Sequence, residues 1–285
     1  MEIDVGCHFE FDLPAITHGV LLVEPHRSEQ ARVTTALLEF SDGVTAVPFV
    51  DAYDNRARRI TAGPGRIDIT FSAVVDVDDV PDPTFVSART ETLEQLPDAT
   101  LQFLLPSRYC ESDRLVDVAW AQFGAIEPGW AQVQAVSDWV HEQIEFDYAR
   151  SSPSYSAASV LDGRVGVCRD FTHLGIGLCR ALNLPARYVF GYLPDIGVPD
   201  PGSPMDFCAW MEVYLGDRWY TFDPRNNQRR VGRVVIGRGR DAADVAMVTT
   251  FGRADLVTMT VVAELGGVAG ETVQKSNLHT GVTAG

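Results

Sequence analysis

The sequence has no apolar run long enough to span a bilayer, and basic residues are scarce relative to acidic ones. Against 23 Lys and Arg stand 39 Asp and Glu, which gives a formal net charge of −16. Such a surface repels nucleic acid and anionic lipid, so neither is an expected partner. The first residues lack the basic start and apolar core of a signal peptide, and we therefore expect a cytoplasmic protein.

Paired cysteine motifs are also missing. The five cysteines are Cys7, Cys110, Cys168, Cys179 and Cys208. They form neither a disulfide framework nor a Cys-x-x-Cys metal motif, so reduced thiols are expected. An acidic stretch, Asp76 to Asp82, lacks the glycine and closing glutamate of a calcium loop. With no nucleotide-binding loop either, the sequence predicts no metal and no cofactor.

What is present in the first third is strand periodicity. Apolar and polar residues alternate from Ile3 to Asp12, as in a strand with one buried face. Similar runs indicate further strands at 19–23, 32–40, 46–51 and 66–77. We predict a β-rich N-terminal domain over residues 1–90, formed by a small antiparallel sheet or sandwich.

The period changes in the middle of the chain. Residues 129–146 carry apolar side chains at three- and four-residue steps, which predicts an amphipathic helix. A polar stretch, 149–166, is interpreted as a loop, and a second apolar helix begins at Cys168. A strand at 186–193 and a hairpin at 209–223 follow. We assign a second domain to residues 91–265 and a disordered tail to 266–285.

The start of the second helix carries the chemistry. Cys168 lies in Gly166-Val-Cys-Arg-Asp-Phe171, where a glycine-bounded loop becomes a helix. The positive end of the helix dipole and the free backbone N–H groups there favour thiolate over thiol. A cysteine in this position is a candidate nucleophile, whereas Cys7, Cys110 and Cys179 are expected in the core.

Three later motifs complete the pattern: Leu182-Asn-Leu-Pro-Ala-Arg-Tyr188, Met205-Asp-Phe-Cys-Ala-Trp210 and Tyr220-Thr-Phe-Asp-Pro224. Together with the cysteine motif, they resemble the bacterial transglutaminase-like proteins over roughly residues 100–250. The resemblance implies an α+β fold with a papain-like transglutaminase core, and an N-terminal β domain as in many members. It also implies a cysteine-dependent amide hydrolase or acyl transferase that acts on a peptide, protein or related amide. The implied catalytic positions are Cys168, Cys208 and Asp223.

Cys208 departs from the family pattern, because that position should hold the histidine base. His173 lies on the cysteine helix but points about 140° away from Cys168, given about 100° of rotation per residue. Other readings stay open: a more distant histidine such as His141, a Cys168–Cys208 disulfide, or an inactive family member that binds a peptide or protein. The sequence does not indicate an oligomeric state.

A local excess of arginine follows the last motif. Six of the residues from Arg225 to Arg240 are arginines, in an otherwise acidic chain. They are expected to pair with the protein's own acidic groups, and the alternative is recognition of a carboxylate on a substrate or partner.

Overall fold

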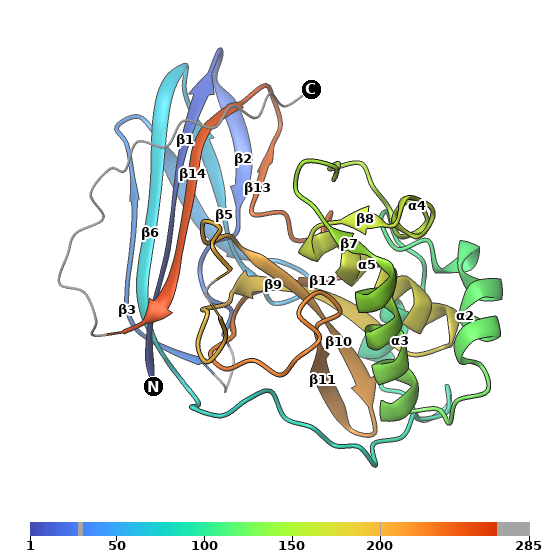
Figure 1. The fold of residues 1–285 in the computed structure, drawn as a ribbon. Helices are drawn as coiled ribbons and strands as arrows, with labels where there is room; N and C mark the ends of the chain where they lie inside the picture. Colours follow the sequence, from blue (N-terminus) through green and yellow to red (C-terminus); the bar gives the residue numbers. More distant parts are fainter. Residues whose placement is uncertain (28–30, 200, 267–285) are drawn as a thin grey trace.

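A computed structural model describes residues 1–27, 31–199 and 201–266 of the protein. The first strands of the chain and the last described strands together form a β-sandwich (Figure 1). Its first sheet has the order β14-β1-β6-β3, formed by β14 (Asp255–Leu265), β1 (Glu2–Leu13), β6 (Gly65–Val77) and β3 (Ala31–Phe40). The second has the order β13-β2-β5-β4, formed by β13 (Val248–Thr250), β2 (Thr17–Leu21), β5 (Arg56–Ala62) and β4 (Thr45–Val50). All pairs are antiparallel.

The alternation in β1 has the consequence predicted from sequence. Ile3, Val5 and Phe9 are buried, while the polar residues between them lie less deeply. β5 was not predicted, because its three arginines obscure the apolar positions Ile60 and Ala62.

The C-terminal strands return to the first sheet. β14 pairs with β1 from Ile3↔Leu265 to Asp12↔Asp255, and β13 pairs with β2. The expected division into residues 1–90 and 91–265 therefore does not describe the pairing of residues 248–265. Strand partners are set by tertiary packing, which composition along the chain does not reveal. Of the expected disordered tail, 267–285 lies outside the described residues.

A third sheet carries the sequence motifs. Its order is β11-β10-β9-β12, formed by β11 (Arg218–Phe222), β10 (Cys208–Leu215), β9 (Ala186–Tyr192) and β12 (Val234–Gly239). The helices α2 (Val116–Phe123), α3 (Trp130–Gln143), α4 (Ala157–Gly163) and α5 (Cys168–Ala181) gather beside this sheet, on the side away from the sandwich (Figure 1). A short helix, α1 (Asp98–Leu101), precedes them in the chain. The α+β class and the mixed core are thus as predicted.

The helix α5 lies close against this sheet. A Cβ on Gly175 would stand 3.0 Å from Met211 Sδ, so a larger residue there would require the methionine side chain to move. The β10–β11 hairpin, with Gly216 at φ 62°, confirms the predicted two-residue turn.

The polar stretch 149–166 was interpreted as a loop, and this is wrong in part. It contains α4 and the short strand β8 (Val165–Gly166), which pairs in parallel with β7 (Glu145–Phe146). α4 is a helix of 7 residues whose Ala157 and Val160 are fully buried. A helix this short carries too few apolar positions for its period to be recognised among serines and glycines.

The sandwich and the third sheet meet directly. Phe9 stacks on Phe207, with ring centroids 6.2 Å apart, and Phe207 immediately precedes Cys208. The Tyr192 hydroxyl donates to the Val23 carbonyl at 3.0 Å. The sandwich therefore helps to place the start of β10. In the described ranges, no helix has the length and apolar character needed to cross a membrane.

Glu212 anchors the face of the third sheet that points away from α5. It accepts from Arg187 Nε at 2.6 Å and from Arg238 Nε and Nη2 at 2.9 and 3.0 Å. Burial opposes its ionisation, but the two guanidinium groups prevail and lower the pKa of Glu212 to about 2. The carboxylate and its arginines thus form a buried charged cluster.

Glu212→Gln should destabilise the protein at pH 7 by about 3 kcal/mol, because a pKa shift from the ordinary value to about 2 corresponds to that free energy. The folded-state pKa is depressed, so the stabilisation is complete above about pH 4.5 and is lost as the pH falls towards 2. Urea unfolding across this range measures it. The exposed Glu142→Gln serves as the control, and a difference between wild type and Glu212→Gln that persists unchanged at pH 2 would contradict the assignment.

Candidate active site

The first turn of α5 is built around Asp170. This buried carboxylate accepts from the Val167 N–H at 2.9 Å and from the Ser151 hydroxyl at 2.6 Å. It thereby caps the helix that begins at Cys168. A Cβ on Gly166 would lie 2.5 Å from the Asp170 Cβ, which explains the glycine of the motif. Cys168 is therefore held at the helix N-terminus, as predicted.

Cys168 and Cys208 lie close together and line the same cleft. Cys168 Sγ lies 3.9 Å from the carbonyl oxygen of Phe207, the residue before Cys208. Interaction with the neighbouring Cys208 thiol lowers the pKa of Cys168, against the opposing effect of burial. Interaction with Cys168, together with burial, raises the pKa of Cys208. The two shifts favour ionisation of Cys168 over that of Cys208.

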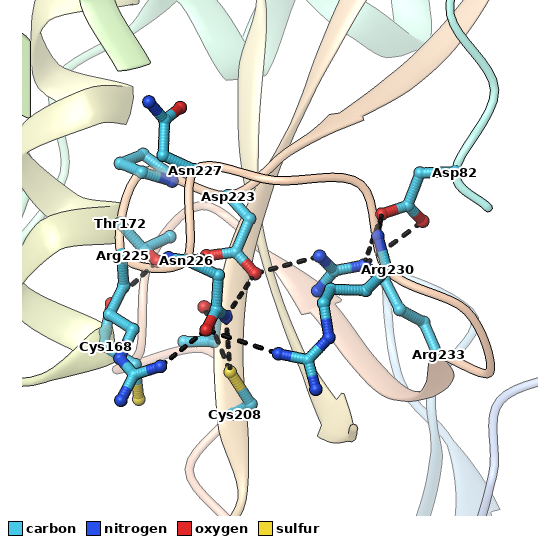
Figure 2. Close-up of polar contacts among 12 residues, drawn as sticks. Asp82, Cys168, Thr172, Cys208, Asp223, Arg225, Asn226, Asn227, Arg230 and Arg233 are labelled. Carbon is cyan, nitrogen blue, oxygen red and sulfur yellow. Dashed lines mark hydrogen bonds and ion pairs between the residues drawn. The ribbon is translucent and has the colours of Figure 1, made fainter. Parts of the chain in front are cut away.

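Asp223 reaches this pair through Asn226, as Figure 2 shows. Asn226 Nδ2 lies 2.8 Å from Asp223 Oδ2 and 4.0 Å from Cys208 Sγ. The Asn226 backbone N–H also donates to Asp223, at 2.9 Å. Asn226 was not singled out from sequence. The available signal was its position three residues after an aspartate, in the turn that follows β11.

A buried arginine fixes the carboxylate. Arg233 Nη2 donates to Asp223 Oδ2 at 2.9 Å, and its Nε donates to Asp82 Oδ2 at 2.9 Å. The guanidinium also lies over the Trp210 ring, 4.7 Å from its centroid. Asp82, from the stretch considered for calcium, is therefore an ion-pair partner of Arg233. This ion pair connects the segment that follows β6 to the site (Figure 2).

Histidines lie elsewhere in the part of the chain that the structure describes. His173 is fully buried between Tyr109 and Tyr188, and burial holds its pKa well below the ordinary value. His141 Nδ1 faces the carbonyls of Pro224 and Arg225 at 3.2 and 3.0 Å. It supports the loop that carries Asn226. No imidazole in the described ranges contacts Cys168; His279 is outside them.

Most of the arginine block pairs internally, as expected from sequence. Arg230 pairs with Asp195, Arg238 with Glu212 and Arg240 with Asp244. Arg225 differs, since its guanidinium lies over the Phe146 ring at 4.4 Å and donates to Asn226 Oδ1. It leaves a positive charge at the cleft without a carboxylate partner among the described residues.

The two cysteines line a cleft of about 160 Å³. Its walls include Phe146, Tyr148, Met205 and Arg225. This volume is below the ordinary range of small-molecule pockets, so it suits one extended side chain or a stretch of backbone. Across the described ranges, His, Cys, Asp and Glu side chains form no group of three or more that could hold a metal ion.

The geometry agrees with comparisons to known proteins. Residues 119–224 match the family model of the Transglutaminase-like superfamily. A crystal structure of a candidate cysteine protease from Cytophaga hutchinsonii is 30% identical, covers 98% of this chain and 94% of its own, and superposes with a TM-score of 0.85.

Two mycobacterial proteins of uncharacterized function are also similar. One from Mycobacterium leprae is 25% identical over 202 residues, which are 69% of this chain and 70% of that protein. One from Mycobacterium tuberculosis is 40% identical over 114 residues, 35% of this chain and 36% of that protein. The chain belongs to the transglutaminase-like superfamily, with a fold like that of a candidate cysteine protease and a β-rich N-terminal region.

Proposed function

We propose that this protein is a cysteine-dependent amide hydrolase or acyl transferase that acts on a peptide, protein or related amide, with Cys168 as its nucleophile. The observation that carries the proposal is the place of Cys168 at the N-terminus of α5, in one cleft with Cys208, where the helix end and the neighbouring thiol favour the Cys168 thiolate. The thiolate is the form of cysteine that attacks a carbonyl carbon.

The proposed reaction has two stages, acylation of Cys168 and release of the acyl group. Cys168 Sγ bonds to the amide carbon, and the developing oxyanion meets the Cys168 backbone N–H, which has no intrahelical acceptor at this position. The carbon–nitrogen bond breaks as the leaving amine takes the Cys208 thiol proton. A thioester remains on Cys168. Water or an amine then attacks it, returns a proton to Cys208 and releases Cys168 as thiolate.

Asp223 acts on this step as a positioning residue. It orients the Asn226 amide, which in turn contacts Cys208 Sγ. A thiol is a weaker base than imidazole at neutral pH. We therefore propose slow acyl transfer, in which Cys208 carries the proton that a histidine carries in other triads.

Alkylation kinetics and adduct mapping test the proposal. With iodoacetamide at pH 7, Cys168 should react about tenfold faster than an ordinary exposed thiol, because more of it is thiolate. Incubation with glutamine-containing peptides should release ammonia or free amine and leave an acyl adduct on Cys168, detected by mass spectrometry. Cys168→Ala is the blank and Cys179→Ala, a core change, the matched control. A slow Cys168 that never becomes acylated would count against an enzyme.

A second candidate function follows from the histidines. No imidazole contacts Cys168 among the described residues. The site is therefore also consistent with a family member that binds a peptide or protein in this cleft without turnover. This alternative predicts saturable binding of peptides that are recovered intact, with equal affinity in the wild type and in Cys168→Ala.

A further inference from the structure

The proximity of Cys168 and Cys208 points to chemistry beyond the proposed acyl transfer. The two residues come from different elements, the start of α5 and the start of β10, and line one cleft. Cys168 Sγ already touches the carbonyl of the residue that precedes Cys208. A disulfide requires Cα atoms within about 7 Å, a condition that residues lining one small cleft can meet.

The other three cysteines provide a contrast. Burial raises the pKa of Cys7, Cys110 and Cys179 to about 12 in each case, so their thiols remain protonated and unreactive. Cys168 is shifted in the opposite direction by its neighbour. Among the described residues, the reactive sulfur and its partner are thus together, and the inert thiols lie away from the cleft.

We propose that Cys168 and Cys208 form an oxidisable dithiol pair, in which a hydroperoxide oxidises Cys168 and Cys208 then closes a reversible disulfide. The disulfide removes the nucleophile from the cleft. That consequence for acyl transfer rests on the proposed function, whereas the pairing of the two sulfurs does not.

The chemistry balances in two steps. The Cys168 thiolate attacks hydrogen peroxide, the oxygen–oxygen bond breaks, and Cys168 sulfenic acid and hydroxide form. The Cys208 sulfur then attacks the Cys168 sulfur, and the sulfenic oxygen leaves as water with the Cys208 proton. Peroxide is reduced by two electrons and the two thiols are oxidised to one disulfide. An external dithiol reverses the change by exchange.

Cys208 suits this role better than it suits that of a base. A histidine at this position would activate Cys168 but would leave its sulfenic acid open to further, irreversible oxidation. Cys208 lies within reach and is held by Asn226 Nδ2 at 4.0 Å from its sulfur. A thiol at the base position therefore lowers the rate of acyl transfer but protects Cys168 from irreversible oxidation.

Oxidation of the full chain tests the pair. Reduced protein is treated with hydrogen peroxide, blocked with an alkylating agent and mapped by mass spectrometry. We expect a peptide that contains Cys168 linked to one that contains Cys208, and its loss after dithiothreitol. In Cys208→Ser, Cys168 should instead form a dimedone-reactive sulfenic acid and accumulate sulfinic acid about tenfold faster than the wild type. Cys179→Ser should leave the yield of the linked peptides unchanged.

Two outcomes would overturn the pair: a stable Cys168 sulfenic acid in the wild type with no linked peptide, or linkage of Cys168 to a cysteine other than Cys208. The test needs no substrate, so it is independent of the proposed function. Disulfide formation without acylation in the reduced protein would leave the dithiol pair standing and remove the enzyme; acylation without a disulfide would do the reverse.

Discussion

Cys208→His should raise kcat/KM for amide cleavage about 100-fold, since a well-placed general base contributes on the order of 10²–10⁴. An imidazole at the start of β10 would face Cys168 with its ordinary pKa near neutrality, so it would accept the thiol proton and return it to the leaving amine. Asn226, held by Asp223, would then contact the ring and help fix its orientation.

Cys208→Ser is the matched control. It replaces the thiol by a hydroxyl donor of similar size that is not a usable base, so kcat/KM should fall below that of the wild type. Ammonia or amine release from a defined peptide measures all three proteins, and the pH profile of Cys168 alkylation reports whether a group near pH 6.5 has been added. If the histidine variant is no faster than the serine variant, the proposed proton-carrying role of position 208 is wrong.

Arg233→Met should destabilise the protein by roughly 3–5 kcal/mol, the range for removing one partner of a buried ion pair. The variant leaves the Asp223 and Asp82 carboxylates facing each other without their shared cation. Both are largely buried, with 2% and 14% of their side chains exposed. The variant also loses the cation–π contact between the Arg233 guanidinium and the Trp210 ring.

Urea unfolding of Arg233→Met is compared with that of Arg229→Met. Arg229 is exposed and donates to the backbone carbonyls of Pro81 and Asp82, so its loss should cost less than about 1 kcal/mol. Adding Asp223→Asn to Arg233→Met should restore part of the stability, because one unpaired charge disappears. Equal midpoints for the two arginine variants would show that the buried network contributes little.

The position of Cys168 at a helix start could be predicted from sequence because its requirements are local. Gly166, Cys168 and Asp170 lie within five residues, and the turn, the cap and the helix start all involve this segment. The hairpin that carries Cys208 was predicted for the same reason. These features depend on neighbours along the chain, which a sequence displays directly.

Contacts between distant residues could not be predicted in this way. Asp82 and Arg233 are 151 residues apart, and nothing in either segment indicates the other. Asn226 could be recognised only once the turn after Asp223 was seen to bring its amide to Cys208. The pairing of β14 with β1 could not be predicted either, because an alternating pattern indicates a strand but not the strand with which it pairs.

The pairing of β1 with β14 also sets the order in which the protein can mature. Chains fold from the N-terminus as they are synthesised, but β1 lacks one neighbour until residues 255–265 have left the ribosome. Phe9 of β1 packs on Phe207, beside Cys208, so a settled sandwich contributes to the placement of the second thiol. Helix α5 ends about 75 residues before β14 begins. A nascent chain therefore carries Cys168 well before the framework around it is closed, and the two thiols take their final positions only once β14 has joined β1.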